Sequence, residues 1–388
     1  MKKYLLIFLL SLLFNFSTQA DHQNEPYAFN KHHKYKIDKS ENHYKFDYDL
    51  QNNELSKKVE EQLKNKKTTN LVSYLLYEDG KIKIDQQTKS KYGKYYPSHS
   101  IGKSLVSVVT GYAVCEGYID SVQSNIDYPT VKNTLYENQK LLHLLNMTAG
   151  DELYLGERYG GWDSRMMNDN QSVNTIPIKT AMKRYFEGSK RNKGTGWNTV
   201  TGEASSGFVY NYSAMTTNVI MNYVIYKTGD DWEKLLHKIF TEDAKVKNKV
   251  YFHKTLRIKD GNRKGEYGRY SFYAQRDDYL RIGLMVMNHW NNDTCVGKYL
   301  KTMYENRVDK DKRTRNTQSA SQYSHGYGGQ FHFDIIGLED RKILSMDGFG
   351  GQQLIIDFDK KRVISVASTD RHYDWYEIVY KTLERSRK

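Results

Sequence analysis

Proline and cysteine are both scarce in this chain, which has four prolines and two cysteines among 388 residues. The two cysteines, Cys115 and Cys295, lie far apart and match no metal-binding or redox spacing. An oxidising compartment would permit a disulfide between them. However, Cys115 falls in an apolar helical pattern, where a buried free thiol is the simpler interpretation, and we expect that state.

Sequence motifs for metal and nucleotide binding are absent as well. The chain contains no His-Glu-x-x-His motif, no zinc-type cysteine pattern and no phosphate-binding glycine loop, so we expect neither a metal nor a cofactor. The histidines near the N-terminus have no ligand spacing, and we do not interpret them as a metal site.

Long hydrophobic runs are absent except at the start of the chain. There, "MKKYLLIFLLSLLFNFSTQA" has a basic start, an apolar stretch over residues 5–14, and small residues at Thr18 and Ala20. This pattern is typical of a signal peptide cleaved after Ala20, and no cysteine follows that would mark a lipoprotein. We therefore interpret residues 1–20 as a signal peptide and expect an exported protein, periplasmic or secreted, without stable membrane insertion.

Acidic residues are in deficit, since 46 Asp and Glu face 59 Lys and Arg and the formal net charge is +13. The basic residues are spread along the chain, which favours a solvated basic surface over a site for a polyanion. No nucleic-acid-binding motif is present, so we expect no nucleic-acid partner. The hydrophobic content of 38% and the 33 tyrosines indicate a globular chain with a sizeable core.

Domain boundaries follow from changes in composition. Residues 21–50 are polar and lack periodicity, which indicates an arm that is extended on the surface or disordered. We place the folded domain at residues 51–388. It opens with a charged amphipathic helix at residues 53–66, and two apolar runs then flank Asp79-Gly80, which is a strong hairpin signal.

The middle of the chain is helical and its C-terminal part is strand-like. Residues 100–116 form a helical pattern that is apolar on most sides, so we expect this helix to lie deep in the protein. We predict further helices at residues 141–151, 216–228, 231–240 and 271–290. The predicted fold class is α+β: an antiparallel sheet built from residues 67–90 and 325–388, flanked by helices, with a mostly helical subdomain over about residues 105–300.

The segment "SHSIGKSL" places Ser100 and Lys103 three residues apart at the start of this apolar helix. Residues with this spacing share one helix face, and the helix N-terminus favours negative charge. Apolar surroundings disfavour the charged form of Lys103, and a neutral amine can accept the proton of a serine hydroxyl. The alternative is a lysine that snorkels to the surface, and the spacing alone leaves both interpretations open.

Five segments of the chain, taken in order, resemble serine hydrolases of the class C β-lactamase-related superfamily. They are "SHSIGKSLVSVVTGYAVCEGYI", "LLHLLNMTAGD", "FVYNYSAMTTNVIMNYVIYKTG", "FYAQRDDYLRIGLMVMN" and "DGFGGQQLIIDFDKKRVISVAS". The superfamily includes class C β-lactamases, D-Ala-D-Ala carboxypeptidases, family VIII carboxylesterases and 6-aminohexanoate-dimer hydrolases. The resemblance covers roughly residues 50–385. It implies a β-lactamase/transpeptidase-like fold with its active site between the sheet and the helical subdomain.

The resemblance also implies roles for single residues. Ser100 matches the nucleophile and Lys103 its partner base. A tyrosine at the start of the middle helix would carry protons to the leaving group. Tyr210 and Tyr212 both compete for this role, and we choose Tyr212 because "YSAMTTN" aligns best when Tyr212 leads.

The third motif of the family is a strand segment beside the serine. Gly348, Phe349 and Gly350 match it, and their glycines would let the backbone approach the substrate. The resemblance implies that the Gly351 N–H pairs with the Ser100 N–H as the oxyanion hole.

Two positions depart from the family pattern. Ala214 stands where the second motif usually has Asn or Ser, and Gly348 stands where β-lactamases have a lysine that binds the β-lactam carboxylate. No glutamate at a class A deacylation position is identifiable. These departures favour the esterase and amide-hydrolase members over the β-lactamases.

We therefore predict an exported serine hydrolase, a carboxylesterase or amidase, that forms an acyl-enzyme with a small-molecule ester, amide or peptide substrate. One alternative is D-Ala-D-Ala carboxypeptidase or β-lactamase-like activity. A second is a non-catalytic binding protein with the same fold. We expect the irregular residues 151–207 to form the cleft walls and to set substrate choice. The sequence does not determine the oligomeric state.

Overall fold

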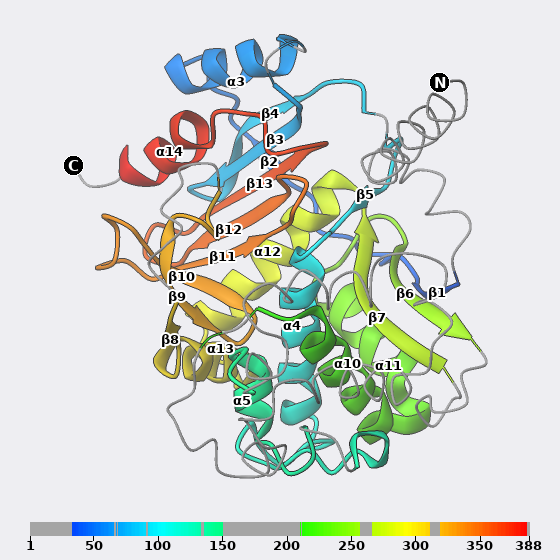
Figure 1. Ribbon diagram of the computed structural model, residues 1–388. Coiled ribbons are helices and arrows are strands. Elements are labelled where there is room, and N and C mark those ends of the chain that lie inside the picture. The colour runs from blue at the N-terminus through cyan, green and yellow to red at the C-terminus, as the bar shows by residue number, and fades with distance from the viewer. Residues whose placement is uncertain are drawn as a thin grey trace, which may run out of the picture.

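The structure is a computed structural model, and it describes residues 33–65, 67, 69–90, 92–132, 136–149, 210, 212–256, 266–310 and 319–385. The predicted signal peptide and the predicted cleft walls lie outside these residues. Figure 1 shows a large sheet and a smaller sheet on either side of a central helix, α4 (Ile101–Cys115).

Among the described residues, a nine-stranded sheet joins the two ends of the chain. Its strand order is β2-β4-β3-β13-β12-β11-β10-β9-β8. Neighbouring strands are antiparallel except β2 and β4, which are parallel. The strands are β2 (Asp47–Tyr48), β3 (Leu71–Glu78), β4 (Lys81–Gln87), β8 (Val308–Asp309), β9 (Ser324–Gly328), β10 (Phe331–Ile335), β11 (Ile343–Asp347), β12 (Gln353–Asp357) and β13 (Arg362–Ser368). The predicted α+β fold class is confirmed.

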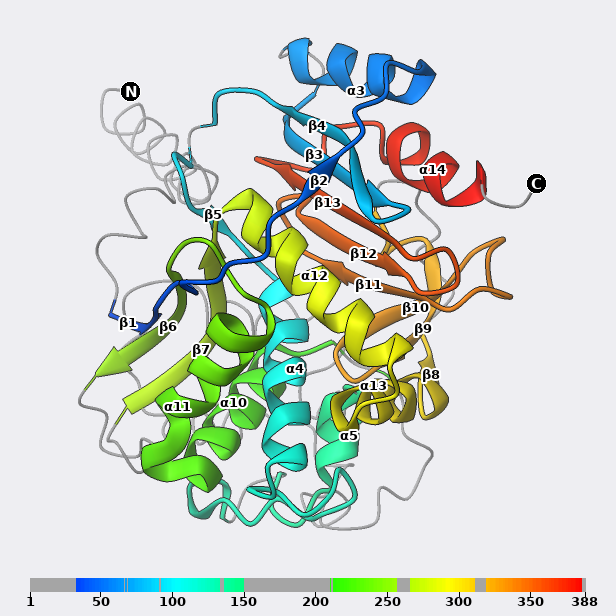
Figure 2. The same ribbon diagram turned by 180° about the vertical axis from the view of Figure 1, so that it is seen from behind.

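The sheet is buried on both of its faces. On β3, Tyr74 and Leu76 belong to one hydrophobic cluster, whereas Leu75 and Tyr77 belong to the other. This division follows from the strand geometry, because successive side chains point to opposite faces. The first cluster includes residues of α3 (Glu54–Lys64) and of the C-terminal segments η6 (Tyr376–Tyr380) and α14 (Lys381–Glu384). Helix α12 (Arg276–Asn291) packs on the second face (Figure 2).

Helix α4 is the core of the helical region, as its apolar pattern predicts. Every residue from Ile101 to Ala113 is buried. The helix packs against α10 (Ala214–Thr228) and α13 (Cys295–Glu305). The other helical elements are η2 (Pro129–Val131), α5 (Leu141–Leu145), η4 (Gly229–Asp231), α11 (Trp232–His237) and η5 (Lys238–Asp243). Within the described parts of the chain, no helix combines the length and the apolar content needed to cross a bilayer.

A second sheet, which the sequence did not predict, has the order β1-β6-β7-β5 in the described residues. Its strands are antiparallel: β1 (Lys34–Ile37), β5 (Tyr96–Pro97), β6 (Val250–Leu256) and β7 (Glu266–Ala274). The predicted helix at residues 271–290 is therefore wrong in its first residues, since residues 271–274 end β7 and α12 begins at Arg276. The several aromatic residues of β7 suit a strand that packs on a helix, and this tertiary contact decides the local structure.

The described part of the predicted N-terminal arm, residues 33–50, belongs to the folded domain. Strand β1 pairs with β6, and its Tyr35 and Ile37 are only 2% and 3% exposed. Strand β2 pairs with β4 in the large sheet. The folded domain therefore includes residues that we predicted to precede its start at residue 51. The sequence did not reveal β1 because two buried side chains between lysines are too short a signal to predict a strand.

The two cysteines form a disulfide, so the predicted free thiol at Cys115 is wrong. Cys115 and Cys295 are bonded, with their Cα atoms 5.8 Å apart. Cys115 ends α4 and is only partly buried, unlike the preceding turns of the helix. The bond ties the C-terminus of α4 to the N-terminus of α13 across 180 residues of sequence.

Candidate active site

The chain enters α4 through a fixed turn. His99 has a φ of +46°, in the left-handed region that costs conformational energy for a residue with a side chain. Ser98 anchors the turn to β7: its N–H donates to Phe272 O at 2.8 Å, and its Oγ accepts the Phe272 N–H at 2.9 Å. Ser100 follows as the N-cap residue of α4, at the helix end where the dipole favours negative charge.

Helix α4 and strand β7 approach each other closely at Gly102. A Cβ atom at this position would lie 2.0 Å from the backbone oxygen of Tyr270, so only glycine fits. The contact brings Tyr270, a residue that sequence reasoning missed, next to the helix turn that carries Lys103. Its sequence signal is the aromatic content of β7, which does not reveal which strand residue contacts α4.

Lys103 is buried between two aromatic rings. Its exposed fraction is 1%. The Nζ atom lies 3.6 Å from the centre of the Tyr270 ring and 5.1 Å from the centre of the Tyr212 ring. An aromatic face attracts a lysine ammonium group, so the two rings hold the side chain in place. Lys103 therefore does not snorkel to the surface.

The structure separates the two candidate tyrosines. The Tyr212 side chain is hydrogen-bonded to the Ser100 side chain. Burial raises the pKa of Tyr212 well above its usual value, and the hydrogen bond to Ser100 opposes this shift. Both tyrosine rings contact Tyr327, with ring centres 4.8 Å away for Tyr210 and 6.1 Å away for Tyr212, but only Tyr212 also has its ring beside Lys103. Ser100, Lys103 and Tyr212 are thus brought together.

The predicted glycines lie in the turn between β11 and β12, which packs against the start of α4. A Cβ atom at Gly348 would lie 2.7 Å from Ser98 O, and one at Gly350 would lie 3.0 Å from the Nε2 atom of His99. The turn can therefore pack closely against Ser98 and His99 because Gly348 and Gly350 have no side chains.

Gly351, the predicted second oxyanion donor, takes part in the hydrogen bonds of the turn. Its N–H donates to Gly348 O at 2.8 Å, which closes the turn. Its carbonyl oxygen accepts the Tyr373 hydroxyl at 2.9 Å. The oxyanion role of the Gly351 N–H stays a prediction.

A buried polar cluster around Lys310 and His332 lies next to Tyr327. The Tyr327 ring packs 5.0 Å from the ring of His332, and Lys310 Nζ lies 3.2 Å from His332 Nδ1. Lys310 also donates to Ser321 O at 2.8 Å and to Ser324 Oγ at 2.6 Å. Burial lowers the pKa of Lys310 to about 7 and holds the pKa of His332 well below its usual value. In the described parts of the chain, no group of three or more His, Cys, Asp or Glu side chains is placed to hold a metal ion.

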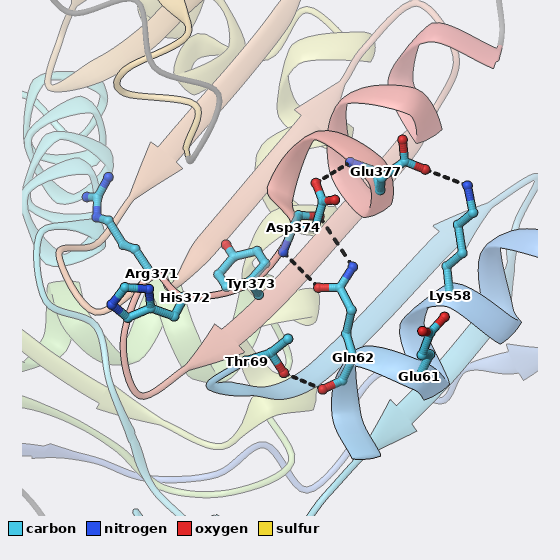
Figure 3. A pocket seen from close by; sticks show the side chains of 9 residues that line it. All are labelled: Lys58, Glu61, Gln62, Thr69, Arg371, His372, Tyr373, Asp374 and Glu377. Carbon is cyan, nitrogen blue, oxygen red and sulfur yellow. Dashed lines mark hydrogen bonds and ion pairs between the residues drawn. The ribbon is translucent and has the colours of Figure 1, made fainter. Parts of the chain in front are cut away.

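A polar groove of about 480 Å³ lies between α3 and the segment that follows β13 (Figure 3). Its lining residues are Lys58, Glu61, Gln62, Thr69, Arg371, His372, Tyr373, Asp374 and Glu377. The N–H of Asp374 donates to Gln62 Oε1 at 2.8 Å, and Lys58 is paired with Glu377. Ser100, Lys103 and Tyr212 are not among the lining residues, so this groove does not coincide with the candidate site.

Several solved structures are similar to this chain in fold. The chain is similar to a protein assigned as a 6-aminohexanoate-dimer hydrolase from Bacillus anthracis, with 14% identity, a TM-score of 0.58, and coverage of 94% of this chain and 92% of that one. It is also similar to a D-stereospecific amidohydrolase from Streptomyces sp., with 14% identity, a TM-score of 0.52, and coverage of 84% and 97%. A class C β-lactamase solved with cefoxitin gives 12% identity, a TM-score of 0.53, and coverage of 84% and 98%.

The chain therefore has a β-lactamase/transpeptidase-like fold, as the resemblance of its sequence motifs implies. No protein-family model and no curated protein matches the chain.

Proposed function

We propose that the chain is an exported serine hydrolase that cleaves an ester or amide bond through an acyl-enzyme on Ser100. The observation that carries this proposal is the fully buried Lys103, held between the rings of Tyr270 and Tyr212 one helix turn from Ser100 at the start of α4. A serine hydroxyl becomes a nucleophile when a neighbouring group accepts its proton. A lysine and a tyrosine gathered at a helix N-terminus provide such a group.

The proposed reaction has two halves. The Ser100 Oγ atom attacks the substrate carbonyl while its proton passes to the Lys103 and Tyr212 pair, which returns a proton to the leaving group. Water then attacks the acyl carbon and gives a proton to the same pair, the bond between the acyl carbon and Ser100 Oγ breaks, and the pair passes this proton to Ser100 Oγ. The Ser100 N–H supplies one oxyanion donor, and the Gly351 N–H supplies the second once it turns from Gly348 O to the substrate oxygen.

The substrate class follows from what lies beside Ser100. The turn at residues 346–352 contains no lysine, so it lacks the group that binds a β-lactam carboxylate in the resembling enzymes. Phe349, at the tip of this turn, is 63% exposed, and we propose that it contacts an apolar part of the substrate. The amide-cleaving activity named for two similar structures supports an amide or a related ester.

Export is supported by two features. The first twenty residues have the composition of a signal peptide. The Cys115–Cys295 disulfide suits an oxidising compartment, where such bonds form and persist.

The test compares wild type with Ser100→Ala on short-chain p-nitrophenyl esters and anilides. Ser107→Ala is the matched control, because it makes the same change farther along α4, where the Ser107 hydroxyl contacts Tyr299 at 2.8 Å. We expect Ser100→Ala to lose turnover and Ser107→Ala to keep it. Equal activity in wild type and Ser100→Ala would contradict the proposal.

Labelling by a fluorophosphonate, read by mass spectrometry, locates the nucleophile without a known substrate. We expect the adduct on Ser100. Stable labelling by a fluorescent penicillin would favour the carboxypeptidase or β-lactamase-like alternative. A wild-type protein that neither turns over esters nor reacts with the phosphonate would favour a non-catalytic binding protein.

A further inference from the structure

Arg371 lies in the segment after β13 and contacts the turn between β11 and β12. In the sheet, β12 lies between β13 and β11. Its Nε atom donates to Phe349 O at 2.9 Å. Its Nη2 atom donates to Asp347 Oδ1 at 2.9 Å and to Gly348 O at 3.3 Å. Three of its hydrogen bonds thus go to the three consecutive residues that begin the turn.

The other end of the guanidinium is held as well. The Nη1 atom donates to Ser319 Oγ and, at 3.5 Å, to Ser321 Oγ. A guanidinium has five N–H donors, and Arg371 makes five hydrogen bonds to these two segments. Arg371 therefore has no donor left for a substrate carboxylate, so we do not interpret it as a substrate ligand.

The ion pair between Arg371 and Asp347 is shielded from water. The Asp347 side chain is 1% exposed and that of Arg371 is 19% exposed. The second carboxylate oxygen of Asp347 accepts the Ser321 N–H at 2.8 Å. Charge-assisted hydrogen bonds of this kind are stronger than neutral ones, and loss of one partner would leave a buried charge without compensation.

We propose that Arg371 is a positioning residue that clamps the turn at residues 347–349 against the start of α4, so that the turn backbone is preset for the substrate oxygen. This proposal rests on the proposed function. The turn is in contact with Ser98, since a Cβ at Gly348 would lie 2.7 Å from Ser98 O. A turn displaced at this point moves backbone groups beside Ser100. Misplacement of such groups by about 1 Å can cost on the order of a hundredfold in rate.

The test measures kcat and KM separately for Arg371→Ala and Arg371→Lys, with an ester substrate that the wild type hydrolyses. We expect both variants to lose on the order of a hundredfold in kcat while KM stays within about threefold, because the clamp acts on the transition state. The lysine variant keeps the charge but cannot make a forked set of hydrogen bonds. Addition of guanidinium ion at a sub-denaturing concentration is expected to restore part of the kcat of Arg371→Ala.

Arg362→Ala is the matched control, because Arg362 is the first residue of β13, whereas Arg371 follows the end of this strand. It is also buried, and it is paired with Glu78 and with Thr382 O at 2.6 Å. We expect it to lower the unfolding midpoint and to leave kcat unchanged. Amide hydrogen exchange at residues 347–351 should rise in Arg371→Ala and not in Arg362→Ala.

The outcomes separate the two proposals. Wild-type kcat and unchanged amide exchange in both Arg371 variants would overturn the clamp alone. A wild-type protein with neither turnover nor phosphonate labelling at Ser100 would overturn the proposed function and the clamp with it. If Arg371→Ala does not fold, the double variant Ser319→Ala/Ser321→Ala removes only the Nη1 acceptors. It is then expected to show a smaller loss of kcat at unchanged KM, and wild-type kcat in it would overturn the clamp.

Discussion

Lys103 is the residue whose surroundings decide how the candidate site operates. It lies between the rings of Tyr270 and Tyr212, and its exposed fraction is 1%. Burial removes the water that stabilises an ammonium group, whereas the two aromatic faces restore part of that stabilisation. The side chain is therefore fixed in position beside Tyr212.

The two tyrosines give a direct test of this site. We expect Tyr212→Phe to lower kcat by a factor on the order of 10² to 10⁴, since it removes the hydroxyl that is hydrogen-bonded to Ser100. Tyr210→Phe is the matched control, because it keeps the ring that packs on Tyr327. Steady-state kinetics on the ester substrate measure kcat for both variants. A larger loss in Tyr210→Phe would reverse the assignment.

At this scale, the sequence predicts what is local and misses what is distant. Ser100 and Lys103 are one helix turn apart, so their spacing alone suggested a pair. Tyr270 and Arg371 reach the site from β7 and from the segment after β13, and no sequence pattern reveals which residue of a distant strand faces a given helix. The sequence likewise did not reveal that the Gly351 N–H donates to Gly348 O, because the hydrogen bonds of a turn depend on its conformation and not on its composition.

At the scale of elements, the contact between α4 and β7 holds the site together. The sequence predicted α4 and the β3–β4 hairpin because each has a strong local signal, a long apolar helical pattern in one and Asp79-Gly80 in the other. In the structure both turn residues have positive φ, 53° and 79°. The sequence missed β7 because its aromatic residues run directly into the helical pattern of α12, and only pairing with β6 distinguishes the two.

Gly102→Ala tests the importance of this contact. The added Cβ would lie 2.0 Å from Tyr270 O, so helix and strand must separate, and we expect a loss of stability of about 1–3 kcal/mol together with a loss of kcat. Gly111→Ala is the control on the same helix. Its Cβ would lie 2.6 Å from a ring carbon of Tyr299, so it should cost stability and leave kcat unchanged. Chemical denaturation and steady-state kinetics measure the two effects, and full kcat in Gly102→Ala would contradict this view.

At the scale of the whole molecule, the Cys115–Cys295 disulfide links two residues that are 180 positions apart in the sequence. A cross-link that closes a loop of this size restricts the unfolded chain and contributes on the order of 5 kcal/mol in the chain-entropy model. It also ties the far end of α4 to α13, the helix that leads into β8.

Reduction of this bond should therefore lower the free energy of unfolding by several kcal/mol, on the order of the loop term. We expect Cys115→Ser/Cys295→Ser to resemble the reduced wild type and to be insensitive to a thiol reductant. Denaturation of both proteins with and without reductant measures this effect. A wild-type midpoint that does not change on reduction would contradict it.

The pairing of β3 with β13 has a consequence for the order in which the protein can be completed. Tyr77 is in register with Val363, so a strand from the start of the domain lies beside one from its end. Until β13 is available to pair, β3 has an unpaired, mostly apolar edge, and such edges favour aggregation. Pairing between residues so distant in sequence also slows folding. Shortening of the chain before β13 would thus leave the centre of the large sheet open and remove Arg371 from the turn beside Ser100.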